Sequence, residues 1–205
     1  MHELFGQTDE NMITKSFPKL YGNLVNLREI LTNDAWIITQ LLMNYNVSKH
    51  LWEVPNPYSI EDALAFIKCA NTDFKTMKAL HFAIESKITP RTRNNLVFVG
   101  TISVKNIDLA DKKADLGYWI GEQYWGRGIA SECLKLVIDY AFSAELGIKR
   151  LCAYVFPENK ASIRVLEKNG MTKIGEVNEY HKLSRRDRTS LIYVTIKNND
   201  VLSPS

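Results

Sequence analysis

The sequence lacks the features that mark a membrane-spanning, secreted or metal-binding protein. It contains no run of about eighteen apolar residues, and its opening segment, MHELFGQTDE, is polar and acidic, unlike a signal peptide. The three cysteines, Cys69, Cys133 and Cys152, are an odd number without metal-ligand spacing. We therefore expect no membrane span and no metal site. Cys133 and Cys152 lie within apolar patterns, which predicts buried free thiols and a reducing compartment, by default the cytoplasm.

A strong charge of either sign is also missing. The net charge of +3 does not by itself indicate a nucleic-acid partner, and the basic run RRDR at residues 185–188 leaves nucleic acid only as a minor alternative. The apolar share of 45% and the charged share of 24% are ordinary for a globular protein. The length of 205 residues fits one domain. We expect a flexible arm at residues 1–16, a single domain at 17–197 and a flexible tail at 198–205.

Two common nucleotide-binding motifs are absent from the stretch that most resembles a ligand site. Residues 114–131, ADLGYWIGEQYWGRGIAS, contain neither G-x-x-x-x-G-K-[ST] nor G-x-G-x-x-G. The stretch begins as a strand, and from Ile129 its apolar residues recur at helical spacing. Gly126 and Gly128 therefore lie at a helix start, where unpaired N–H groups favour an anion and the missing Cβ atoms allow close approach. A bound pyrophosphate and a plain strand-to-helix turn both fit this pattern.

Three motifs match one family, in the order in which that family carries them. Gln123 to Gly128 has the form Q-x-x-G-x-G, and residues 157–171, PENKASIRVLEKNGM, contain N-x-x-S-x-x-V-L-E-K-x-G-[FM]. Upstream, residues 57–63 are PYSIEDA. With these motifs the chain resembles the GNAT N-acetyltransferases, and in particular their RimJ/RimL-type branch. The resemblance extends over residues 20–196.

The resemblance implies a mixed α/β fold. Its sheet is mostly antiparallel, with two central parallel strands that splay apart at one end, and helices flank it. Periodicity separately predicts a β-α-β-α-β middle, which makes the strand at 114–120 parallel to the one at 150–156. Ser59 and Asp62 have the spacing of a capping box at a helix start. Further predicted strands are Leu20–Ile30, Leu80–Glu85, Leu96–Val104, Met171–Val177 and Thr189–Ile196.

The resemblance also implies acetyl-CoA as the ligand. N–H groups of the glycine turn would bind the pyrophosphate, with added charge from Arg127. The backbone at 118–120 would bind the pantetheine arm and the thioester carbonyl, while its side chains pack in the core. Asn159 matches an asparagine that bonds the pantetheine arm, although a helix N-cap explains it as well. The residues expected to bind acetyl-CoA are Tyr118, Trp119, Ile120, Gln123, Gly126, Arg127, Gly128, Ile129, Ala130, Ser131, Asn159 and Ser162.

The catalytic residues match the family less completely. Many members carry a tyrosine acid where this chain has Leu166, and a leucine cannot donate a proton. Ser162 matches the branch's serine near the thioester sulfur and would donate a proton to the leaving thiolate, unless the thiolate leaves without a dedicated acid. Glu122, beside the central strand, is the candidate general base. The alternatives are the carboxylates of Asp115, Glu85 and Glu132, the imidazole of His181 or an ordered water.

These matches predict an enzyme that transfers the acetyl group of acetyl-CoA to a primary amine. No cysteine has the context of a nucleophile, so the amine would attack directly within a ternary complex. The acceptor would be a protein or peptide N-terminus or a small amine, and the enzyme a monomer or homodimer. A non-catalytic acetyl-CoA or CoA-binding sensor on the same fold is the alternative.

Three polar segments are expected to line the acceptor site, at Asn44–Ile60, Thr89–Asn95 and Asn178–Arg188. They carry aromatic residues and arginines, so the expected groove has basic and aromatic walls. Because like charges repel, such walls favour a peptide N-terminus or an acidic amine over a polyamine.

Overall fold

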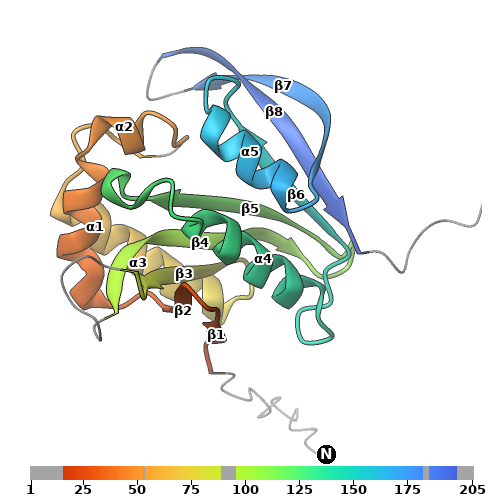
Figure 1. Ribbon diagram of the computed structural model, residues 1–205, viewed down its shortest axis with the longest axis horizontal. Helices are drawn as coiled ribbons and strands as arrows, with labels where there is room; N and C mark the ends of the chain where they lie inside the picture. The colour runs from red at the N-terminus through yellow and green to blue at the C-terminus, as the bar shows by residue number, and fades with distance from the viewer. Residues whose placement is uncertain (1–15, 53, 89–95, 182–184, 198–205) are drawn as a thin grey trace, which may run out of the picture.

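The computed structural model describes residues 16–52, 54–88, 96–181 and 185–197. The predicted tail at 198–205, the turn at 89–95 and all but the last residue of the predicted arm at 1–16 lie outside these ranges. The described residues form one sheet with helices on both faces (Figure 1). Within them, no helix has both the length and the apolar character needed to cross a bilayer.

Eight strands of the described chain form a single sheet in the order β1-β2-β3-β4-β5-β6-β8-β7. Neighbouring strands are antiparallel except for β5 and β6, which run parallel. This confirms the predicted mixed, mostly antiparallel sheet. The strands span Leu20–Tyr21 (β1), Val25–Glu29 (β2), Leu80–Ser86 (β3), Val97–Asp108 (β4), Lys113–Ile120 (β5), Arg150–Val155 (β6), Thr172–His181 (β7) and Arg186–Ile196 (β8).

The parallel strands β5 and β6 are paired over only part of their length. Their ladder ends where Leu116 lies opposite Ala153, whereas β5 continues to Ile120 and β6 to Val155. Past Leu116, the β5 backbone groups that point away from β4 have no strand partner in the described chain. The splay expected of the two central strands is therefore present, and it opens inside the sheet.

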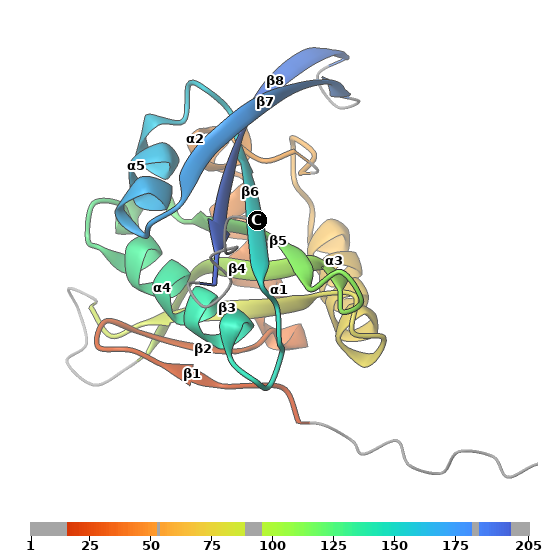
Figure 2. The ribbon, with the colours of Figure 1, turned by 90° about the vertical axis from the view of Figure 1, so that its right-hand side faces the viewer.

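Helices cover both faces of the sheet. Figure 2 shows α4 and α5 on one side and α3 on the other. The α4 side holds the larger core, with Phe82 and Leu151 fully buried, and the opposite side holds a smaller core around Ile38 and Phe98. The α-helices and 3₁₀ turns span Thr32–Asp34 (η1), Ala35–Leu42 (α1), Tyr45–Ser48 (α2), Ile60–Lys75 (α3), Glu122–Tyr124 (η2), Ile129–Phe142 (α4) and Lys160–Lys168 (α5).

The start of α3 has the predicted capping box. Ser59 Oγ accepts the N–H of Asp62 at 3.1 Å, and the Asp62 carboxylate accepts the N–H of Ser59 at 2.9 Å. Two backbone groups that the helix itself leaves unpaired are thereby satisfied. The hydrogen bonds from the Ser59 hydroxyl and N–H also hold the pKa of the Asp62 carboxyl below its usual range.

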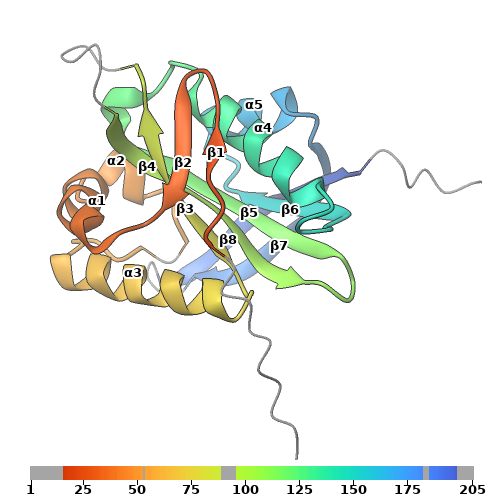
Figure 3. The same cartoon turned by 90° about the horizontal axis from the view of Figure 1, so that it is seen from below.

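The first predicted strand, Leu20–Ile30, is interrupted in the structure. β1 and β2 are separate and joined by a tight turn, where the Glu132 carboxylate of α4 accepts the N–H groups of Asn23 and Leu24 at 2.8 and 2.7 Å. Seen from below in Figure 3, α4 runs beside β1 and β2. The turn depends on a carboxylate from a distant part of the chain, so the local apolar pattern does not reveal it.

The segment Asn178–Arg188, predicted as a loop, is mostly a β-hairpin. β7 continues to His181 and β8 begins at Arg186, with these two residues opposite each other. The hairpin extends past α5 at the top of Figure 1. Its described residues from 178 to 188 are largely exposed, so they show no apolar alternation from which a strand is normally predicted.

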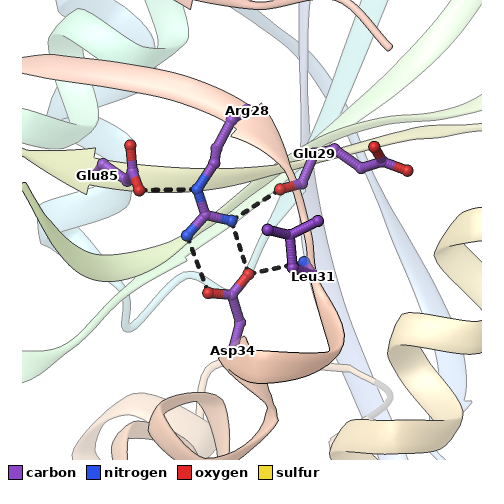
Figure 4. A network of polar contacts seen from close by, with 5 residues as sticks. All are labelled: Arg28, Glu29, Leu31, Asp34 and Glu85. Atoms are coloured by element: carbon purple, nitrogen blue, oxygen red, sulfur yellow. Dashed lines mark hydrogen bonds and ion pairs between the residues drawn. The ribbon is translucent and has the colours of Figure 1, made fainter. Parts of the chain in front are cut away.

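Arg28 of β2 ties η1 to the sheet. Its guanidinium donates to the Glu85 carboxylate of β3 at 2.7 Å and to both oxygens of Asp34 at 2.7 and 2.9 Å (Figure 4). Asp34 is only 7% exposed and also accepts the N–H of Leu31 at 2.8 Å. The bond to Asp34 is the main reason that the pKa of Arg28 is raised above its already high ordinary value. Glu85, an alternative general base from the sequence, is thus part of a structural ion-pair network.

Candidate functional site

A cavity of about 1050 Å³ opens where β5 and β6 part. Its walls come from the ends of both strands, the turn before α4, the exposed face of α5, the loop after α2 and the β7–β8 hairpin. The volume lies just above the range usual for small-molecule sites, about 300–1,000 Å³. The expected ligand-binding residues that line it are Tyr118, Trp119, Ile120, Gly126, Arg127, Gly128, Ile129, Ala130, Ser131, Asn159 and Ser162.

The turn before α4 holds two glycines in the left-handed region. Gly126 has φ +74°, and Gly128, the N-cap of α4, has φ +79°. Residues other than glycine rarely adopt this backbone conformation. A Cβ placed on Gly126 would meet no atom within 4 Å. The backbone at Gly126 therefore borders open space. Together with Arg127 and the first N–H groups of α4 in the same wall, the turn can bind an anion.

Gln123 is the one expected ligand-binding residue that is not in the cavity wall. It lies in η2, and its carbonyl accepts a hydrogen bond from the Arg127 guanidinium at 3.0 Å, so it shapes the turn. Trp125, which the sequence pattern did not single out, does line the cavity. Its indole N–H donates to the Ile120 carbonyl at 2.6 Å. That bond joins the turn to the end of β5 and occupies a carbonyl expected to serve the ligand.

Consecutive residues of β5 face opposite sides of the sheet. Tyr118 turns toward α5, where its hydroxyl lies 2.7 Å from Ser162 Oγ, and burial raises the pKa of this phenol to about 12. Trp119 turns toward the smaller core and packs on Phe98, with ring centroids 6.2 Å apart. The sequence predicts core packing for both side chains. Tyr118 does pack against the larger core, and its hydroxyl also brings a polar group to the cavity.

Asn159 caps α5, as one of its two interpretations from the sequence predicts. Its Oδ1 accepts the N–H of Ser162 at 3.1 Å. At the other end of the helix, the Asn169 side-chain amide donates to the Ser131 hydroxyl at 3.1 Å and so connects α5 to α4. Leu166, which replaces the family's tyrosine, is 1% exposed in the larger core.

A row of cations on α5 was not singled out from the sequence. Lys160, Arg164 and Lys168 all line the cavity, and their spacing of four residues places them on one helix face. Together with Arg127, which lines the same cavity, they make this part of the wall positively charged. Such a surface attracts polyanions.

The candidate base Glu122 lies outside the cavity wall. Its two carboxylate oxygens accept the side-chain amides of Asn44 and Asn46 at 2.6 and 2.9 Å, so it holds α2 against η2. Glu85 and Glu132 are likewise engaged in the structural contacts described above. Geometry gives none of these three carboxylates access to a ligand in the cavity.

Asp115 is the candidate carboxylate that does line the cavity, on the sheet face opposite α4 and α5. It accepts the Asn106 side-chain amide at 2.8 Å. Tyr154 lies nearby, and its pKa is raised by burial and then by the charges of Asp115 and Glu179. Lys105 adds a positive charge to the same wall. This wall is mixed in charge, whereas the sequence predicts a basic one.

Two aromatic rings of the cavity wall, one of them covered by an arginine, form a rim. The Arg188 guanidinium stacks over Phe156, 3.3 Å from the ring centroid, and makes an ion pair with Glu158. Phe156 in turn stacks on Trp52, with centroids 5.6 Å apart. The rim joins the hairpin, the start of α5 and the loop after α2. Because Glu158 neutralises Arg188, the charge argument for an acidic acceptor is weakened, and that preference stays a prediction.

His50 lines the cavity beside this rim. Its Nδ1 is buried and has no hydrogen-bond partner among the described residues. Burial, followed by the charge of Lys49, lowers the pKa of the imidazole. His50 is therefore neutral near pH 7, a property that no sequence motif indicated.

The described cysteines are all free thiols: Cys69 is exposed, Cys133 is buried and Cys152 is intermediate. The expectation of a buried thiol is therefore confirmed for Cys133 and only partly for Cys152. Across the described ranges, no group of three or more His, Cys, Asp or Glu side chains is arranged to hold a metal ion.

Comparisons with known proteins agree with this geometry. The acetyltransferase (GNAT) domain family matches residues 25–172. The chain is 30% identical over 181 residues to the uncharacterized N-acetyltransferase YoaA of Bacillus subtilis (strain 168). The aligned region covers 88% of this chain and 98% of that protein.

Two solved structures illustrate the shared fold. RimJ of Mycobacterium smegmatis, in complex with CoA-disulfide, has a TM-score of 0.73 at 23% identity, over 87% of this chain and 85% of that one. The microcin C7 self immunity acetyltransferase MccE, in complex with acetyl-CoA and AMP, has a TM-score of 0.72 at 23% identity, over 86% and 94%. The family match, the near full-length relative and the shared fold show that this chain belongs to the GNAT acetyltransferase family.

Proposed function

We propose that this protein is an acetyl-CoA-dependent N-acetyltransferase whose acceptor is a primary amine on a peptide or protein N-terminus or on a small molecule. The observation that carries the proposal is one continuous cavity. It runs from the positively charged turn before α4, through the gap between β5 and β6, to the mixed wall on the opposite sheet face. RimJ and MccE, solved with CoA-disulfide and with acetyl-CoA, support it through the same fold.

The cavity fits the parts of acetyl-CoA in order. The pyrophosphate binds the N–H groups of Gly126, Gly128 and the first turn of α4, residues 129–131, with Arg127 and the α5 cations adding charge. The pantetheine amides pair with the free backbone groups of β5, as an added strand would. The thioester then lies in the gap itself, open to an amine from the opposite face.

The reaction is a direct attack. The amine nitrogen bonds to the thioester carbon, the C–S bond breaks, and the amine proton passes to a base or to water. Backbone N–H groups of β5 that point into the gap stabilise the oxyanion. Ser162 faces the leaving sulfur. Asp115 is the candidate carboxylate within reach of the acceptor side, whereas Glu122 would act only if Asn44 and Asn46 released it.

Calorimetry with acetyl-CoA and a free-thiol assay test this function. The amine panel contains peptides with free N-termini, amino acids, spermidine and an aminoglycoside. We expect acetyl-CoA to bind, and we expect acetylation of at least one amine class to release the free thiol of CoA. Binding without turnover on every amine would favour the non-catalytic sensor, and absence of binding would reject both. We place the reaction in a reducing compartment, the cytoplasm, because the described thiols are free.

A further inference from the structure

Two hydroxyl groups meet between β5 and α5. The Tyr118 hydroxyl lies 2.7 Å from Ser162 Oγ and 3.4 Å from the Ser162 carbonyl oxygen. Both residues line the cavity, and Tyr118 lies just past Leu116, where β5 and β6 part. The pair therefore borders the gap in which the thioester is proposed to lie.

The chemistry of the two groups gives their hydrogen bond a direction. Each hydroxyl has one proton to donate and can also accept. A phenol is more acidic than an aliphatic alcohol and is therefore the better donor. Both atoms that the Tyr118 hydroxyl reaches belong to Ser162 and can accept. When Tyr118 donates to Ser162 Oγ, the proton of Ser162 is left to point into the cavity.

We propose that Tyr118 is a positioning residue for the leaving group. It donates to Ser162 and so directs the Ser162 O–H at the sulfur of CoA, where it hydrogen-bonds to the thiolate as the C–S bond breaks. The inference rests on the proposed acetyl-CoA site. It assigns this chain a thiolate-stabilising pair, Tyr118 with Ser162, at a site where Leu166 can supply no proton.

The pair stabilises the thiolate without protonating it. A thiol has an ordinary pKa of about 8.5, whereas burial raises the pKa of Tyr118 to about 12 and an aliphatic alcohol is a weaker acid still. Transfer of a proton from either hydroxyl to the sulfur would therefore be uphill. The C–S electron pair therefore stays on sulfur, and both hydroxyl protons stay in place. This differs from the role predicted from the sequence, in which Ser162 gives up its proton.

The local structure holds both partners in position before any ligand arrives. Tyr118 lies on a strand that is paired through Ile102 of β4. Ser162 lies in the first turn of α5, where its N–H is fixed by Asn159. Donors that are already oriented toward a developing negative charge need no reorganisation when the charge appears.

The decisive measurement is the pKa of the thiol of bound CoA. Protein saturated with CoA is titrated with base while the ultraviolet absorbance of the thiolate is recorded. In the unaltered protein we expect this pKa to lie below that of free CoA. Tyr118→Phe and Ser162→Ala should each raise it by about one unit, which is tenfold, or about 1.4 kcal/mol. The double variant should raise the thiol pKa no more than Ser162→Ala alone does, because the two groups act as a unit.

Turnover provides a second readout. Tyr118→Phe should lower kcat about tenfold and leave the KM for acetyl-CoA unchanged, because the interaction strengthens only as charge develops on sulfur. Ser162→Thr keeps the hydroxyl and should keep the lowered thiol pKa. A purely structural role for Tyr118 would not move the thiol pKa.

Tyr193→Phe is the matched control. Tyr193 is a buried tyrosine whose hydroxyl donates to Glu167 at 3.0 Å, and it does not line the cavity. Its loss should leave the thiol pKa unchanged. A Tyr118→Phe protein that binds CoA with an unchanged thiol pKa would overturn the positioning role alone. If the unaltered protein does not bind CoA, the proposed function fails and this inference fails with it.

Discussion

Replacing Gly126 by alanine separates the ligand role of the turn before α4 from its backbone strain. Gly126 has φ +74°, and a Cβ there would meet no protein atom within 4 Å. The substitution therefore causes no clash inside the protein. Its cost to folding is the left-handed conformation alone, about 1–2 kcal/mol for an L-residue.

Affinity for acetyl-CoA should fall for a different reason. The added methyl group enters open space in the cavity wall where the proposed pyrophosphate approaches the backbone N–H groups. The strained turn can also relax and turn those N–H groups away. We expect binding to weaken tenfold or more, which corresponds to about 1.4 kcal/mol.

Gly147 supplies the matched control, because it has φ +71°, a Cβ there would also meet no atom within 4 Å, and it lies outside the cavity past the other end of α4. Urea denaturation should show similar losses of stability for Gly126→Ala and Gly147→Ala. Calorimetry should show weakened acetyl-CoA binding only for Gly126→Ala. If both variants bind as tightly as the unaltered protein, the turn does not hold the pyrophosphate and the reasoning is refuted.

Three other predictions concern stability and are measured by chemical denaturation. Glu132→Ala removes a charged acceptor from two N–H groups of the β1–β2 turn and should cost about 2 kcal/mol; a loss under 0.5 kcal/mol would contradict the anchoring role. Arg28→Met leaves the Asp34 carboxylate buried without its cation and should cost at least about 2 kcal/mol of stability. The double variant Arg28→Met with Asp34→Leu should lose less stability than Arg28→Met alone, and losses that simply add would argue against an energetic coupling between the two residues. Burial lowers the pKa of folded His50 below its ordinary 6.5, so the unfolded state binds more protons in this range. The free energy of unfolding should therefore fall as the pH drops through about 6.5, and His50→Asn should make that fall less steep. Equal pH slopes for the variant and the unaltered protein would refute this role of His50.

Elements with local patterns could be predicted from the sequence. The apolar periods on either side of Gly126 and Gly128 gave the central strand and the helix that follows it, and the Ser59–Asp62 spacing gave a capped helix start. The division of Leu20–Ile30 into two strands could not be predicted, because the turn is held by a carboxylate more than a hundred residues away. The hairpin at Asn178–Arg188 was missed because its strands are solvated and lack alternation.

The same distinction applies to the candidate site. The glycine turn is a contiguous motif, so the resemblance to the family's Q-x-x-G-x-G loop was enough to predict that it borders the ligand site. The contact between Tyr118 and Ser162 joins a strand to a helix 44 residues later, and the rotation of each element that brings the hydroxyls together is set by packing. Its place beside the central strand makes Glu122 a candidate base from the sequence, and only the fold shows that Asn44 and Asn46 already occupy its carboxylate.

The strand order has a consequence for how the molecule is made. β8, the last strand of the described chain, lies between β6 and β7 in the sheet. Until β8 emerges from the ribosome, β7 has no neighbouring strand within the described part of the chain, and β6 has only its short ladder with β5. A nascent chain that stops before residue 186 therefore presents β6 as a bare strand edge, the kind of edge that pairs with other chains. Pairing of β8 with β6 covers that edge.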